Sequence, residues 1–200
     1  MNPAYNDMLA GAIAQAVDEA AAKLEPAALR VGAVLMRDRS EWFNGAAFGG
    51  KNPKKKMHGL INDIRDPVVV SDQLLALQAT RADGGTVATL VSWSGHPEVV
   101  GDRNTLLSAD YVYELRKAVE GHYGGTAVFI PESLGGMMSA AGGDVPLVDA
   151  VGKWQWQPDG TAPVWADHDT FEFARSLAVH LADAVTVALR ARHETSRSAA

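Results

Sequence analysis

The chain has 200 residues, of which 47% are hydrophobic and 21% charged, a composition typical of a globular domain. Its net charge of −6 disfavours a nucleic-acid partner, because phosphates are bound by clustered lysine and arginine. The lack of cysteine excludes disulfides and thiolate ligands, so a metal site would use His, Asp, Glu or Tyr. We expect no signal peptide and no integral membrane segment, which leaves a cytoplasmic location as the default and the compartment otherwise unknown.

The first third of the chain is predicted to hold one helix, one strand and one long loop. Apolar residues recur every three or four positions from Leu9 to Leu24, which indicates a helix that ends at Pro26. Residues 29–35 alternate as a half-buried strand does. Residues 37–65 are rich in Gly, Asn, Lys and Pro and should form a loop. The lysines in 51–56 are interpreted as a solvated turn, with an anion site as the alternative.

Two strands, 74–80 and 87–93, follow in the middle of the chain. Asp83, Gly84 and Gly85 lie between them and are a strong hairpin signal. The second strand is almost continuously apolar, so we expect it to be central in the sheet and covered on both faces.

Helices and one more strand complete the predicted pattern. Ser108 is the predicted cap of a helix whose inward residues span 112–119, and residues 126–130 are a short buried strand. Residues 171–189 have helical periodicity, with Asp169 as the predicted cap.

The order of these elements predicts an α/β fold, a mixed β-sheet covered by helices in a single domain. We expect this domain to span residues 1–193 and to be incomplete, with residues 194–200 as a disordered tail. A homo-oligomer is compatible with this organisation.

The end of the strand 87–93 is the first candidate for a functional site. Ligands of open α/β sheets gather beyond the carboxyl ends of strands, where loops 94–101 and 131–146 should lie. We expect the two loops to leave the same edge of the sheet. His96, between Gly95 and Pro97, would suit a metal ligand or a general base there, and a histidine bonded to nearby backbone is the alternative.

Other side chains offer weaker candidates. Additional histidines and one His-Asp pair could complete a metal site, although exposure at a helix end suits His122 better. Three tryptophans could line a hydrophobic groove, and covering the core edge or an oligomer contact is the favoured alternative. These candidates are His58, His122, His168, Asp169, His180, His193, Trp154, Trp156 and Trp165.

The segment from Asp66 to Glu120 resembles the neutral/alkaline (non-lysosomal) ceramidase family and its bacterial relatives. In both, an Asp-Pro leads into a hairpin, the second strand ends in His-Pro or His-Gly, and a segment like "NTLLSADY" (104–111) starts a helix. The resemblance extends over residues 5–190.

The resemblance implies a zinc amidohydrolase that cleaves the N-acyl bond of ceramide, with His96 as one zinc ligand. It also implies an active-site serine near residues 135–139. When the sequence is aligned with the family, the position of that serine is occupied by Met138, and Ser139 is the next residue. An alternative alignment uses residues 143–146, which contain no serine. The family's other histidine lies before the first helix, and its carboxylate and tyrosine ligands follow residue 200. One histidine cannot hold a catalytic zinc.

Three functional hypotheses follow from the sequence. The first is part, or a degenerate relative, of a zinc-dependent amidohydrolase acting on a lipid or other small-molecule amide, with His96 as metal ligand and Ser139 as catalytic residue. The second is a non-catalytic binding or assembly protein that keeps the fold without a complete metal site. The third, a serine hydrolase using Ser94 or Ser139, ranks last because the sequence has no Gly-x-Ser-x-Gly motif.

Overall fold

The computed structural model describes residues 3–36, 57–58, 61–62, 71–133, 140–141, 143–191 and 193–194. Its elements, in chain order, are α1 (Pro3–Ala21), β1 (Ala28–Leu35), β2 (Met57–His58), β3 (Ile61–Asn62), β4 (Gln73–Thr80), β5 (Thr86–Trp93), α3 (Tyr111–Tyr123), β6 (Thr126–Pro131), α4 (Phe171–Arg190) and β7 (His193–Glu194). Of the loop predicted over residues 37–65, the structure describes only the short antiparallel pair β2 and β3. Residues 195–200 of the predicted tail lie outside the described residues.

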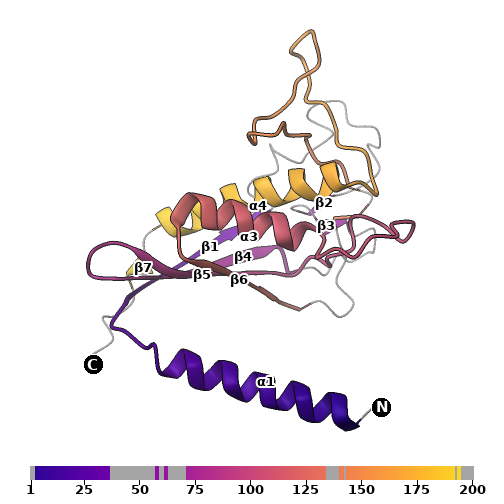
Figure 1. Cartoon of the computed structure of the whole chain (residues 1–200). Helices are drawn as coiled ribbons and strands as arrows, with labels where there is room; N and C mark the ends of the chain where they lie inside the picture. The colour runs from indigo at the N-terminus through magenta and orange to yellow at the C-terminus, as the bar shows by residue number, and fades with distance from the viewer. Residues whose placement is uncertain are drawn as a thin grey trace.

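The principal sheet has five strands in the order β6-β5-β4-β1-β7. The pairs β1–β4, β4–β5 and β1–β7 are antiparallel, whereas β5 and β6 are parallel. Helices α3 and α4 lie side by side over one face of this sheet (Figure 1). The mixed sheet and its helical layer confirm the predicted α/β fold.

The β4–β5 hairpin forms where the sequence predicts it. The Arg81 N–H donates to the Gly85 carbonyl at 2.8 Å, and the Asp83 carboxylate accepts from the Gly85 N–H at 2.8 Å. Gly84 has a φ of 87°, a left-handed conformation that favours glycine. Turn chemistry alone therefore fixes this part of the topology.

Strand β5 is central, as predicted, because it pairs with β4 on one side and β6 on the other. The expectation that both its faces are covered was wrong. Thr89, Val91 and Trp93 are buried, whereas the alternate residues are only partly buried. Since α3 and α4 cover one face, the apolar residues on the other face have no described layer over them.

Strand β6 lies at the edge of the sheet, which contradicts the prediction of a buried strand. Ala127 is its only buried residue, and Val128 and Ile130 are 40% and 46% exposed. No described helix covers the second face of β6, and local pattern does not reveal which strand ends a sheet.

The core lies between the helical layer and the sheet. Helix α4 contributes Phe173, Leu177 and Leu181 and approaches β1 closely. A Cβ added at Gly32 would lie 1.9 Å from the Ala188 carbonyl oxygen, so only glycine permits this approach. Helix α3 adds Leu115 to the same core.

Both predicted helix caps shift in the structure. Ser108 accepts the Asp110 N–H at 2.9 Å, and Asp110, at φ 54°, accepts the Tyr111 N–H and is the cap of α3. Thr170 rather than Asp169 caps α4, accepting the Phe173 N–H at 3.0 Å. Ser108 lies two positions before the actual cap of α3, and Asp169 lies one position before the actual cap of α4.

Helix α1 confirms the predicted opening helix but stands apart from the core. It lies on the side of the sheet opposite α3 and α4 (Figure 1), and none of its residues is buried. Among the described helices, none is long and apolar enough to cross a membrane.

Candidate functional site

Strands β5 and β6 end together at one edge of the sheet. Their last pair is Trp93 with Pro131, and the Glu132 N–H donates to the Trp93 carbonyl at 3.3 Å. The chain therefore leaves both strands at the same place, as predicted for loops 94–101 and 131–146. Of the second loop, residues 134–139 and 142 lie outside the described residues, and Ser139 is among them.

Ser94 takes part in a chain of hydrogen bonds at this edge of the sheet. Its buried hydroxyl donates to the Ser71 carbonyl, and the Ser71 hydroxyl donates to the Glu132 carboxylate at 2.7 Å. The link joins the start of β4 to the residues that follow β5 and β6. A buried hydroxyl that already donates to a backbone carbonyl suits a structural role, and this weakens the hypothesis of Ser94 as a nucleophile.

An aromatic pair supports the backbone just before His96. A Cβ added at Gly95 would lie 2.4 Å from the Trp93 ring, so the indole packs directly against the glycine. Tyr111 meets Trp93 edge-on at 5.6 Å, and its hydroxyl donates to the Gly95 carbonyl at 2.6 Å. Burial, with a contribution from the nearby Asp110 carboxylate, raises the pKa of Tyr111 well above its usual range. The phenol therefore stays protonated and donates to Gly95.

His96 is half-buried at the start of a tight turn. The Glu98 N–H donates to the His96 carbonyl at 3.0 Å, and the Gly101 N–H donates to the Glu98 carbonyl at 3.2 Å. Val99 and Val100 then return to the core, and the Val100 N–H donates to the Asp110 carboxylate at 2.9 Å. The imidazole is thus carried by a turn that is anchored on both sides.

The described residues do not fit a complete zinc site. Among them, no three His, Asp or Glu side chains gather closely enough to hold a metal ion. Zinc sites need at least three protein ligands, and His96 alone could offer only one. Any further ligands would have to come from outside the described residues.

Two other candidate histidines, His168 and His180, each form a hydrogen bond with a backbone carbonyl group. A ring nitrogen of His168 lies 2.8 Å from the Gly143 carbonyl oxygen, and one of His180 lies 2.9 Å from that of Pro146. Burial lowers the pKa of His180 to about 4, so its ring is neutral at pH 7. Both rings fix residues 143–146 against α4. Asp169, the other member of the His-Asp pair, forms an ion pair with Arg103 at 3.0 Å. The side chains of His58 and His193 lie outside the described residues.

The tryptophans pack over the end of the helical layer. Trp154 stacks on Trp156 with ring centroids 6.0 Å apart and meets His180 edge-on at 5.3 Å. Trp165 forms an isolated antiparallel β-bridge with Pro146. This arrangement agrees with the alternative in which they cover an edge of the core.

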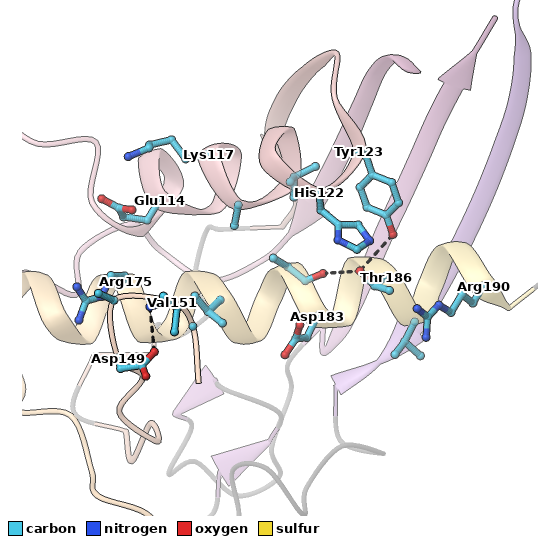
Figure 2. Close-up of a pocket in the computed structure, with 17 residues that line it drawn as sticks. Glu114, Lys117, His122, Tyr123, Asp149, Val151, Arg175, Asp183, Thr186 and Arg190 are labelled. Atoms are coloured by element: carbon cyan, nitrogen blue, oxygen red, sulfur yellow. Dashed lines mark hydrogen bonds between the residues drawn. The ribbon is translucent and has the colours of Figure 1, made fainter. Parts of the chain in front are cut away.

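A groove of about 730 Å³ lies elsewhere, between α3, α4 and the turn at residues 149–152 (Figure 2). Tyr123 donates across it to Thr186 at 3.2 Å, and His122 is exposed beside them, as its helix-end position predicts. Side chains of both signs line it: Glu114, Lys117, Asp149, Arg175, Asp183 and Arg190. The mixed charges favour no single class of ligand, and His96 does not line the groove.

Comparison with known proteins bears on the fold. No family model and no curated protein matches the sequence. Among solved structures, neutral ceramidase from Pseudomonas aeruginosa matches with a TM-score of 0.54 and 17% identity, over 91% of this chain and 25% of that one. A structure described as ceramidase complexed with C2 matches with a TM-score of 0.56 and 18% identity, over 88% and 24%.

The fold is similar to part of neutral ceramidase. At these identities the likeness establishes the fold alone, and the chain spans about a quarter of the length of the proteins it matches. The resemblance that the sequence carries in residues 66–120 therefore agrees with the fold, while the link Ser94–Ser71–Glu132 and the support of Gly95 by Tyr111 emerge only from the structure. No sequence pattern marks these contacts, because each joins segments that are far apart in the chain.

Proposed function

We propose that this chain is part, or a divergent relative, of a ceramidase-like amidohydrolase, to which it contributes His96 as a metal ligand. The observation that supports this most is the edge of the sheet. Strands β5 and β6 are parallel neighbours that end together, so His96 and the residues after β6 leave at one place, where α/β folds bind ligands. The similarity of the fold to part of neutral ceramidase supports the ceramidase-like class in this proposal.

The activity in this proposal is zinc-dependent hydrolysis of an N-acyl amide, with a lipid amide as the substrate class. Ser139, in the loop that follows β6, is proposed as a catalytic residue that contacts the substrate. The described residues lack a complete metal site, so the remaining ligands are supplied by polypeptide outside them. We therefore expect the purified chain to turn over a fluorescent ceramide weakly or not at all. Chelator-sensitive turnover at a rate typical of enzymes would contradict this expectation.

Metal binding tests the role of His96. Zinc titrated into the purified chain by calorimetry should bind weakly, because the ligand set is incomplete. His96→Gln should weaken that binding by at least about tenfold, since even the loss of a residue that only orients a metal ligand costs about 10–100-fold. His122→Gln is the matched control, because it alters an exposed histidine on α3 away from the sheet edge. Binding that His96→Gln leaves unchanged would remove His96 from the proposal.

A non-catalytic binding or assembly protein is the second candidate. It is favoured by the lack of a metal-binding group among the described residues and by the apolar surface on the side of the sheet that no described element covers. In that case zinc would bind neither to His96 nor to a site that depends on it.

A further inference from the structure

The sheet has one apolar face that no described element covers. Because side chains alternate along a strand, the residues between the buried ones point away from α3 and α4. We name this surface the open sheet face and define it by Leu29, Val31, Ala33, Leu35, Leu75, Leu77, Ala79, Ala88, Leu90, Val128 and Ile130.

The strand register makes this face continuous. Leu77 pairs with Val31 on one side and with Leu90 on the other, and Leu90 pairs with Val128. Four strands thus contribute one apolar row across the centre of the face. The polar residues in the same rows are Gln73, Ser92 and Thr126, and none of them is charged.

Helix α1 adds a second apolar surface on the same side of the molecule (Figure 1). Its stripe contains Tyr5, Leu9, Ile13 and Val17, which are between 44% and 62% exposed. These positions recur every four residues, so they lie along one side of the helix. A helix and a sheet that both expose apolar surface are typical of elements that lack a partner layer.

The size of this surface suits a stable protein interface. Four strands about 4.8 Å apart and about 23 Å long, with a helix about 28 Å long, give a footprint of roughly 700 Å². Specific interfaces bury about 600–1,000 Å² on each partner, a range that includes this footprint. The surface is therefore large enough to hold two chains together.

The charge around this surface argues against a lipid membrane as the occupant. The charged residues of α1 are Asp7, Asp18 and Glu19, all acidic, and the open sheet face carries no lysine or arginine. Anionic membranes attract basic surfaces, so they would repel this one. An uncharged apolar face, by contrast, is complementary to itself, as a two-fold symmetric interface requires.

We propose that a second copy of this chain covers the open sheet face, forming a two-fold symmetric dimer. The open sheet faces and the α1 stripes of the two copies are buried against each other, so that two sheets form the inside of the dimer and α3 and α4 remain outside. This assembly does not depend on whether His96 binds a metal.

Light scattering coupled to size-exclusion chromatography tests the proposal on the purified chain. The wild type should have twice the monomer mass, and Val128→Glu should reduce it to the monomer mass at the same micromolar concentration. Leu107→Glu is the matched control and should stay dimeric, because Leu107 is fully exposed and lies outside the open sheet face. A wild-type monomer, or an assembly that Val128→Glu leaves unchanged, would overturn the proposal.

Cross-linking provides a second measurement that does not depend on a destabilising charge. The chain has no cysteine, so Leu77→Cys places a single thiol near the centre of the open sheet face. Mild oxidation should then give a disulfide-linked dimer, whereas Leu107→Cys should remain largely uncross-linked. Equal cross-linking of the two variants would count against the proposed interface.

Discussion

The hydroxyl of Tyr111 donates a 2.6 Å hydrogen bond to the carbonyl of Gly95, the residue before His96. Tyr111 is the first residue of α3 and is completely buried. The bond therefore couples the start of a core helix to the turn that presents the imidazole. The chain uses its interior to hold an otherwise irregular segment in one conformation.

Tyr111→Phe should destabilise the protein by roughly 1–3 kcal/mol, because it leaves a buried carbonyl without its donor. Urea unfolding measures this change. Tyr113→Phe is the control, since Tyr113 is on the same helix, is 53% exposed and should tolerate the change with little effect. Equal stabilities for the two variants would show that the bond to Gly95 contributes nothing.

Gly95→Ala should destabilise the protein by about 1–3 kcal/mol, because the added methyl group would overlap the Trp93 ring. Gly121→Ala makes the same change within α3, where a Cβ meets nothing within 4 Å. Alanine should be better there than glycine by about 0.5–1 kcal/mol. The unfolding temperature should therefore fall for Gly95→Ala and rise for Gly121→Ala.

The stability of the protein should fall in acid because His180 is buried as a neutral ring. Its pKa is about 4 in the folded state against an ordinary 6.5, so the unfolded state binds more protons between these values. The contribution is complete above pH 6.5 and is lost as the pH falls toward 4, by an amount on the order of 3 kcal/mol. Denaturation at several pH values should show this slope.

His180→Gln should flatten the dependence of stability on pH in that window, even though it lowers stability at pH 7. His122→Gln should preserve the slope, because its ring is exposed. A slope that survives in His180→Gln would assign the acid sensitivity to other groups.

Asp110→Ala should cost about 1–3 kcal/mol, because Asp110 accepts the N–H groups of both Tyr111 and Val100. Its φ of 54° adds strain for alanine, whereas asparagine tolerates this conformation. Asp110→Asn should therefore be the milder of the two variants when their unfolding midpoints are compared. Equal losses for the two variants would argue that the charge, which both substitutions remove, and not the backbone conformation, dominates at this position.

Local sequence signals predicted the positions of helices and strands better than they predicted which faces of these elements are buried. The hairpin follows from Asp83 and the glycines after it, and the long helix α4 follows from its apolar periodicity. The cap of α3 was misplaced because Asp110 adopts a left-handed conformation that brings its carboxylate, rather than the Ser108 hydroxyl, to the first turn. The cap of α4 was misplaced because Thr170 accepts the Phe173 N–H while Asp169 pairs with Arg103.

The errors about β5 and β6 have one cause, the absence of a layer over the open sheet face among the described residues. An apolar strand predicts burial, but which face is buried depends on elements far away in the chain or in another one. The candidate site likewise has a part that local sequence predicts and a part that depends on distant contacts. The position of His96 at the end of a strand was predicted, whereas the support that Ser94 and Tyr111 give it depends on contacts between distant segments.

The most direct test of the proposed role of His96 is an anomalous difference map, measured at the zinc edge, from crystals of the chain grown with zinc. Because the ligand set is incomplete, we expect a partly occupied zinc, seen as a peak about 2.0–2.1 Å from a ring nitrogen of His96. A zinc ion bound at other histidines, with no peak beside His96, would contradict it.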